Sequence, residues 1–316
     1  MNLMYQQMLD DSQPSFTNPY ESLAGLSTTG SSQIPEFNVE TFLDWQLYVK
    51  GSHSYFLRLH FFFDFIHQSL PILYESRFFD ELNLKPQSRP LLALQYAVGA
   101  LGASLSPSHE QTQQKYYKES RKYLEMCEIE EDEAEFANLH TFQALLLLLR
   151  YEIMASKITR AWMTLGRAIR LASVLNLHKM DSMMPVEEIV AGLHVNLPST
   201  TDAVVLEERR RAFWCLFILE TYVRTRSGMP CQLGQSYSFE MNLPSPGPLT
   251  LEFEAIEMPF LRNMNITYGE LSSYAACVIM VDLAIKCYEH AEDRGIESQV
   301  QGFWIRPHQI DTRQLY

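Results

Sequence analysis

The sequence lacks clustered cysteines. Its 316 residues carry five cysteines, and no two of them form a Cys-x-x-Cys pair; they are Cys127, Cys215, Cys231, Cys277 and Cys287. A structural zinc site needs thiolates at short spacing, so these cysteines do not predict a zinc cluster. Scattered thiols of odd number are typical of reduced, mostly buried side chains in an intracellular protein.

Positive charge is also scarce. The chain has 25 basic and 38 acidic residues, which gives a formal net charge of −13. Its average field repels phosphate, so only a local basic patch could bind nucleic acid. The one basic run is Arg209–Arg211. Its arginines could contact phosphate or an acidic partner, or they could pair internally with Glu207, Glu208 or acidic residues of a neighbouring helix.

Long apolar runs and catalytic motifs are missing as well. The most apolar run, Ala144–Leu149, is too short to span a bilayer, and residues 1–11 lack the features of a signal peptide. The chain has no nucleophile elbow, P-loop, dinucleotide-binding glycine motif or His-Glu-x-x-His. His53, His60 and His67 would lie about 10 Å apart along a helix, too far to share one metal ion. We therefore expect no enzyme, no cofactor, no metal and no membrane contact.

What the sequence does contain is helical periodicity. Apolar residues three and four apart predict helices over several ranges, and Leu139–Tyr151 is apolar on nearly all sides, as in a buried helix. Consecutive helices of this kind predict an all-α fold of antiparallel hairpins, similar to an α-solenoid. The other main ranges are Pro90–Ser104, Gln111–Met126, Thr159–Leu175, Glu207–Val223 and Tyr274–His290.

The stretch from Thr159 to Leu243 is the most informative. It reads as two amphipathic helices joined by a long loop. Asn176 is expected to end the first helix in the left-handed conformation. Glu207 and Glu208 are expected at the positive start of the second, which Gly228 and Pro230 should end.

The order LGRAIRLA, LNLH, EERRRAFW, LFILE, SGMP and LP resembles the middle-homology, or fungal-specific transcription factor, domain. That domain is the regulatory body of fungal zinc-cluster transcription factors. Two departures remove an arginine and so alter a family ion pair: Glu220-Thr221 replaces Asp-Arg, and Gly228-Met229-Pro230 replaces Gly-Arg-Pro. The matching positions with an expected structural or regulatory role are Gly166, Arg167, Arg170, Arg210, Arg211, Phe213, Trp214, Gly228 and Pro230.

The resemblance also predicts an organisation. Residues 1–38, rich in Gln, Ser, Thr, Asn and Pro, are expected to be a disordered leader or linker. Residues 39–295 would form the helical regulatory domain, and residues 296–316 a poorly defined tail. In the family such a linker follows a six-cysteine zinc cluster, which is absent from these 316 residues.

We therefore expect a nuclear transcription regulator that lacks its own DNA-binding cluster. It would reach DNA only indirectly, through another transcription factor or a coactivator, and it suits a secondary-metabolite gene cluster. One alternative is a truncated zinc-cluster DNA-binding activator. Another is a helical ligand-binding module or enzyme.

Three further features allow two interpretations each. Trp162, Phe213, Trp214 and Phe217 could line a pocket for a small-molecule effector or simply fill the core. The acidic stretch Glu128–Glu135 could be an activation-type surface or a solvated helix start. A fold of this family with apolar helices would allow a homo- or heterodimer as well as a monomer.

Overall fold

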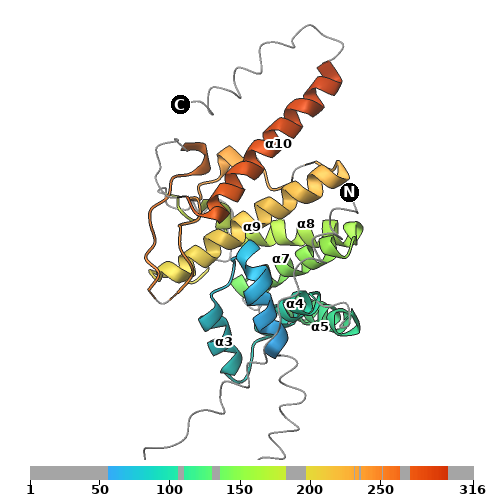
Figure 1. Ribbon diagram of the computed structural model, residues 1–316, viewed down its shortest axis with the longest axis vertical. Coiled ribbons are helices and arrows are strands. Elements are labelled where there is room, and N and C mark those ends of the chain that lie inside the picture. The colour runs from blue at the N-terminus through green and yellow to red at the C-terminus, as the bar shows by residue number, and fades with distance from the viewer. Residues whose placement is uncertain are drawn as a thin grey trace, which may run out of the picture. The chain divides into compact units, whose positions relative to one another are not determined.

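A computed structural model describes residues 56–105, 110–129, 136–182, 197–230, 232–234, 236–250, 252–263 and 271–297. All of them fall in one compact unit, Lys50–Tyr316. The regular elements in these ranges are helical, apart from one isolated bridge between Asn242 and Phe260 (Figure 1). The predicted all-α fold is confirmed. The α-helices are α3 (Glu75–Asn83), α4 (Arg89–Ala103), α5 (Glu110–Ile129), α7 (Leu139–Met154), α8 (Ile158–Val174), α9 (Ala203–Ser227) and α10 (Ser273–Glu297).

Short helical pieces connect these helices. A helical turn from residue 56 leads into the π-helical segment η2 (Phe62–Ile66), and the 3₁₀ turn η3 (His67–Ser69) follows it directly. Three more 3₁₀ turns lie in the second half of the chain: η5 (Leu177–Lys179), η6 (Ser236–Ser238) and η7 (Leu261–Asn263). In the described ranges no helix is both long enough and apolar enough to cross a membrane.

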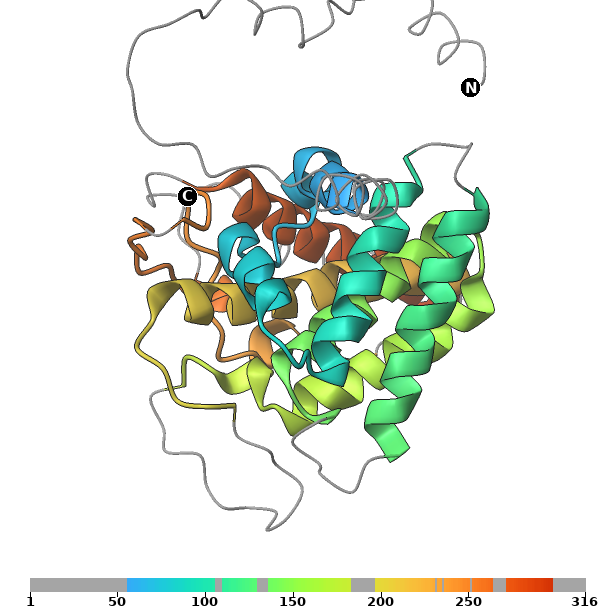
Figure 2. The ribbon, with the colours of Figure 1, turned by 90° about the horizontal axis from the view of Figure 1, so that it is seen from below.

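Helix α7 lies at the centre of the packing. It contacts α4 on one side and α8 and α9 on the other, while α5 packs on α4 and α10 packs on α9 (Figures 1 and 2). Leu145–Leu149 are each 0% exposed, as expected for a helix that is apolar on nearly all sides. The pairs α4–α5 and α7–α8 are joined by short connections and form helix hairpins.

The ends of the helices follow from local sequence. Asn138 caps α7 by accepting a hydrogen bond from the Thr141 backbone N–H at 3.0 Å, and Asp202 caps α9 by accepting one from Val204 N–H at 2.9 Å. Asn176 follows α8 with φ +51°, and Gly228 ends α9 with φ +68°. Both helix ends lie where the sequence predicts them.

The start of α9 differs from the prediction. The helix begins at Ala203 after the Asp202 cap, so Glu207 and Glu208 lie inside the helix rather than at its positive end. Both carboxylates are buried and have specific partners. The apolar spacing indicates this helix only from Glu207 onwards, whereas its true start is set by Asp202, and aspartate is among the best N-caps.

One close backbone contact fixes α4 against the segment before η2. A Cβ atom added to Gly102 would lie 1.9 Å from the carbonyl oxygen of Arg58, which is an impossible separation. Only glycine allows the two backbones to approach this closely.

Several predictions concern residues outside the described ranges. They include the leader 1–38, His53, residues 130–135 of the acidic stretch, residues 183–196 of the long loop, and residues 298–316 of the tail. The domain limits at residues 38 and 295 stay predictions.

Candidate functional site

Helix α9 carries a buried carboxylate that organises two arginines of the basic run. Glu207 is 0% exposed. Its Oε1 accepts hydrogen bonds from Arg211 Nε at 2.9 Å and from the Ser245 backbone N–H at 2.9 Å, and its Oε2 accepts one from Arg210 Nη1 at 2.7 Å. We call Glu207, Arg210, Arg211, Asp181 and Ser245 the Glu207 centre. A buried charge is stable only when it is paired and hydrogen-bonded in this way.

Arg210 joins α9 to Asp181, which follows the 3₁₀ turn η5. Its Nη2 and Nε donate to the two carboxylate oxygens of Asp181 at 2.7 and 3.1 Å, and Asp181 Oδ2 also accepts the Asn242 backbone N–H at 2.8 Å. Burial lowers the pKa of Arg210, but the hydrogen bonds and charges of Asp181 and Glu207 outweigh this effect and leave the pKa raised. This guanidinium therefore stays charged while it is enclosed.

Arg211 joins the same centre to the segment after α9 and to α10. It donates to the carbonyl oxygens of Ser245 at 3.1 Å and Gly247 at 2.8 Å. The Tyr274 hydroxyl, from the first turn of α10, donates to the Arg211 carbonyl at 3.0 Å. Burial raises the pKa of Tyr274 well above its ordinary value, so the hydroxyl remains a donor.

The third arginine of the run, Arg209, also has an internal partner, because its Nη2 donates to the Pro198 carbonyl at 2.8 Å. The neighbouring Glu208 pairs with Arg77 and accepts the Tyr74 backbone N–H. The internal pairing considered for this run is thus present, and its three arginines hold the fold together.

The aromatic motif residues lie in the core. Phe213, Trp214, Phe217 and Phe239 are buried and meet edge to face, and Trp214 Nε1 donates to the Asn242 carbonyl at 2.7 Å. Trp162 packs against the same core from a partly exposed position. These side chains fill space among themselves, as the core interpretation expects.

The remaining motif residues lie on α8 and after α9, and only Gly166 among them is buried. Arg167 of α8 pairs with Glu128 of α5, and Arg170 lies over Gly166, where an added Cβ atom would meet its Nη1 at 3.4 Å. Gly166 is therefore not required by a close helix contact. Pro230 is exposed after the Gly228 helix end.

The two departures from the family pattern meet in one turn. Glu220 is 3% exposed and its Oε1 accepts the backbone N–H groups of Gln232 at 2.6 Å and Leu233 at 2.8 Å. The carboxylate holds the chain that follows Gly228, while Met229 in that turn is exposed. A carboxylate–backbone contact is therefore present at a place where the resemblance leads us to expect an altered ion pair.

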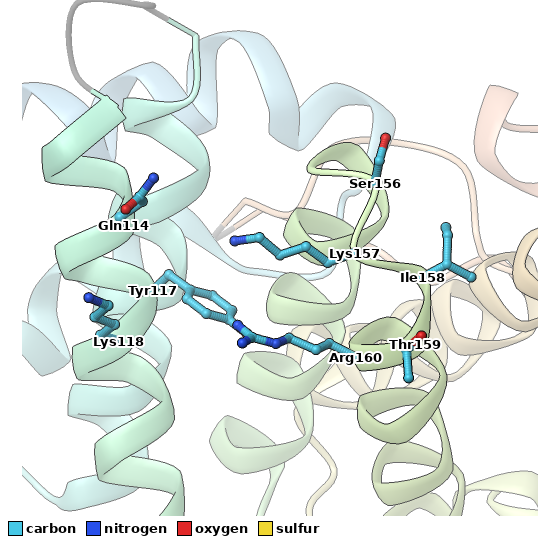
Figure 3. A pocket seen from close by; sticks show the side chains of 8 residues that line it. All are labelled: Gln114, Tyr117, Lys118, Ser156, Lys157, Ile158, Thr159 and Arg160. Carbon is cyan, nitrogen blue, oxygen red and sulfur yellow. The ribbon is translucent and has the colours of Figure 1, made fainter.

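A cleft of about 590 Å³, lined by none of these residues, lies between α5 and the turn that joins α7 to α8 (Figure 3). Sequence reasoning missed it because its walls come from two ranges forty residues apart, and neither range carries a motif. The residues that line it are Gln114, Tyr117, Lys118, Ser156, Lys157, Ile158, Thr159 and Arg160.

No group of His, Cys, Asp and Glu in the described residues could hold a metal ion. The described cysteines, Cys127, Cys215, Cys277 and Cys287, form no disulfide with one another. Burial raises the pKa of the Cys215 thiol beyond its ordinary range, so this side chain is an unreactive core residue.

Comparison with known proteins extends the resemblance. Residues 59–293 match the fungal specific transcription factor domain. The depudecin biosynthesis cluster-specific transcription activator of Fusarium langsethiae is 38% identical over 244 residues, which cover 77% of this chain and 39% of that protein. The activator of the same name from Alternaria brassicicola is 39% identical over 249 residues, which cover 77% of this chain and 37% of that protein. The citrinin biosynthesis transcriptional activator of Monascus ruber is 28% identical over 255 residues, 78% of this chain and 48% of that protein.

The chain thus spans well under two thirds of the length of these curated relatives. No solved structure matches it. The relatives are named as transcription activators and not as enzymes, in agreement with the expectation from the missing catalytic motifs. With residues 59–293 matched, the chain belongs to the family of fungal specific transcription factor domains.

Proposed function

We propose that this chain regulates transcription of a secondary-metabolite gene cluster in the fungal nucleus, and that it acts through another regulator bound to DNA. The observation that carries the proposal is the similarity over most of the helical domain to proteins named as cluster-specific activators. Those names support activation rather than repression.

The charge distribution favours contact with a protein over contact with DNA. The chain carries a net charge of −13, and phosphate binding depends on uncompensated cations. The three arginines of the basic run are engaged with Glu207, Asp181 and backbone carbonyls inside the fold. The five scattered cysteines do not supply the clustered thiolates of a zinc cluster, which supports DNA recognition through a partner.

The proposal is tested by deleting the gene in the fungus that carries it and then reintroducing a gene for the 316-residue chain. We expect transcripts of the neighbouring biosynthetic genes to fall on deletion and to return with the 316-residue chain. Restoration with Glu207→Ala, which breaks the Glu207 centre, should fail. Transcripts that do not change on deletion would rule out the regulatory role.

Action through a partner needs a separate test. The purified chain should not shift the cluster promoters at physiological salt, whereas the tagged chain in the nucleus should be recovered with those promoters by chromatin immunoprecipitation. Specific binding of promoter DNA by the purified chain alone would contradict indirect action.

A second function is favoured by one observation, the greater length of the relatives. In that case the chain is the regulatory part of an activator that binds DNA through its own zinc cluster. Mapping the 5′ end of the transcript separates the two. An upstream in-frame exon with six closely spaced cysteines beside a basic run would establish the second function.

A further inference from the structure

The cleft between α5 and the α7–α8 turn contains cations without acidic partners. Lys118, Lys157 and Arg160 line it, and no carboxylate does. Among the described residues none of these three cations forms an ion pair, although the chain has 38 acidic and only 25 basic residues. Arg121 lies close by on α5, but its charge is balanced by Glu152, whose Oε1 accepts from Arg121 Nη1 at 2.9 Å. The cleft therefore has an excess of positive charge in an acidic protein.

Two stacked tyrosines form the floor beneath one of these cations. The rings of Tyr117 and Tyr151 lie 4.9 Å apart at 26°, and Lys157 Nζ is 5.1 and 5.4 Å from their centroids. The Tyr117 hydroxyl donates to Glu152 Oε1 at 2.6 Å, which fixes the ring. Cation–π contact orders the Lys157 ammonium without neutralising it. An ordered and uncompensated cation is well prepared to receive an anion.

The charged ends of two side chains from the α7–α8 turn lie on the same side of the cleft, facing α5 (Figure 3). Figure 3 shows the side chains of Lys157 and Arg160 reaching towards α5, with Arg160 beside the Tyr117 hydroxyl. Burial raises the pKa of Tyr117, and the Glu152 carboxylate raises it further. This hydroxyl is thus neutral and already committed as a donor, so a new anion would bind to Lys157 and Arg160.

The start of α8 adds to the positive electrostatic potential of the cleft. Lys157 is the N-cap of this 17-residue helix and makes no side-chain capping bond, and the first turn contains no acidic residue. In α7 and α9, by contrast, Asn138 and Asp202 occupy the backbone N–H groups. Free N–H groups and the positive end of the helix dipole favour an anion beside Lys157 and Arg160.

The space suits a small molecule with an uncharged body. A neighbouring cavity of about 440 Å³ shares Gln114 and Lys157 with the cleft, and Glu110, Tyr151, Met154 and Ala155 line it, so its one carboxylate favours an uncharged body there. Ligand sites in proteins are typically 300–1,000 Å³ and mix apolar walls with a few placed polar groups. The charged end would bind Lys157 and Arg160, and the body would lie against the small exposed part of Tyr117 and Tyr151, each 4% exposed, and extend towards Met154.

We propose that this cleft is a binding site for a small carboxylate with a flat, unsaturated body. Arg160 and Lys157 bind the carboxylate, and Tyr117 and Tyr151 position the body. The site is separate from the Glu207 centre and uses none of the family-motif residues. It does not depend on which genes the chain regulates, so binding can be tested apart from transcription.

The test compares 2-naphthoate with its neutral analogue 2-naphthamide on the purified full chain by isothermal titration calorimetry. We expect naphthoate to bind at least tenfold more tightly than naphthamide, since hydrogen bonds to charged groups carry that much discrimination. Lys157→Gln and Arg160→Gln should each weaken naphthoate binding at least about tenfold. The matched control is Lys122→Gln, which removes a cation of α5 outside the cleft and should leave the affinity unchanged.

Other results overturn the proposal. It is wrong if the two probes bind equally well, if neither binds, or if the cleft variants keep the wild-type affinity. A hexaglutamate peptide that binds more tightly than naphthoate and depends on the same two cations would assign the cleft to an acidic protein segment instead. Arg160→Lys, which keeps the charge, serves as the second variant if Arg160→Gln does not fold, and it should retain part of the affinity.

Discussion

The basic run of α9 and the cations of the cleft differ in whether the fold pairs them with acceptors. Arg209–Arg211 form the only basic run in the sequence, yet in the fold each of these arginines has an internal acceptor. Lys118, Lys157 and Arg160 are dispersed in the sequence, yet they meet around one cleft without a carboxylate. The comparison teaches that density of charge along a sequence does not identify a binding surface. What matters is whether the fold supplies the opposite charge.

The physical reason is desolvation. The arginines of the Glu207 centre have lost most of their water, and that loss is tolerable only because carboxylates and carbonyls replace it. The cations of the cleft keep contact with solvent, so they need no internal partner. Removing a charge should therefore cost stability in the first region and ligand affinity in the second.

The largest loss of stability is expected when the Glu207 centre is broken. Glu207→Ala leaves two enclosed guanidinium groups short of a partner, and we expect the free energy of unfolding to fall by about 3–5 kcal/mol. Urea denaturation followed by circular dichroism measures it. Glu119→Ala is the control, because Glu119 meets Lys122 on the exposed face of α5 and should cost less than about 1 kcal/mol. If the free energy of unfolding of Glu207→Ala lay within about 1 kcal/mol of wild type, the arginines of the Glu207 centre would not differ in role from the cations of the cleft.

A pH effect on stability should follow from His67, whose ring lies against Phe62 and Phe63 and is influenced by the charge of Arg211. Burial lowers its pKa to about 4, although its Nε2 donates to the Leu73 carbonyl at 2.8 Å, and the charge of Arg211 lowers it further. The unfolded chain takes up this proton near pH 6.5, so the folded state loses stability as pH falls from 6.5 towards 4, by up to about 3 kcal/mol. Unfolding measured across this range should show a slope that His67→Gln removes. Equal slopes in the two chains would contradict the assignment.

The next largest change in stability is expected from substitution of two glycines. Gly102→Ala places a methyl group against the Arg58 carbonyl and should destabilise the fold by about 1–3 kcal/mol or more. Gly166→Ala, at a family-motif position with room for a Cβ atom, should change stability by less than about 1 kcal/mol and in the stabilising direction. Thermal unfolding of both variants compares them directly. The reverse order would show that the motif glycine, and not Gly102, controls helix packing.

Local rules accounted for the helices. The apolar periodicity placed α4, α5, α7 and α8 within a few residues, and it placed the start but not the end of α10, which runs on to Glu297. Asn176 and Gly228 end their helices as left-handed residues do. These features depend on neighbours in sequence, so the sequence contains them.

The polar centre and the cleft depend on distant residues. Asp181 pairs with Arg210 across 29 positions, and Ser245 meets Glu207 across 38. Nothing within either segment specifies its partner. The cleft was missed for the same reason, since Tyr117 and Lys157 come together only when α5 packs beside the α7–α8 turn. The signal that was available, unpaired cations at an uncapped helix start, has meaning only once that packing is known.

The most direct test of this account measures two quantities on one chain, the Lys157→Gln, Arg160→Gln double variant. The account predicts that its affinity for 2-naphthoate falls at least tenfold, while its free energy of unfolding stays within about 1 kcal/mol of wild type, as for exposed charges. An unchanged affinity, or a loss of several kcal/mol in stability, would show that the cleft cations are structural like those of the Glu207 centre, and the distinction between the two regions would be lost.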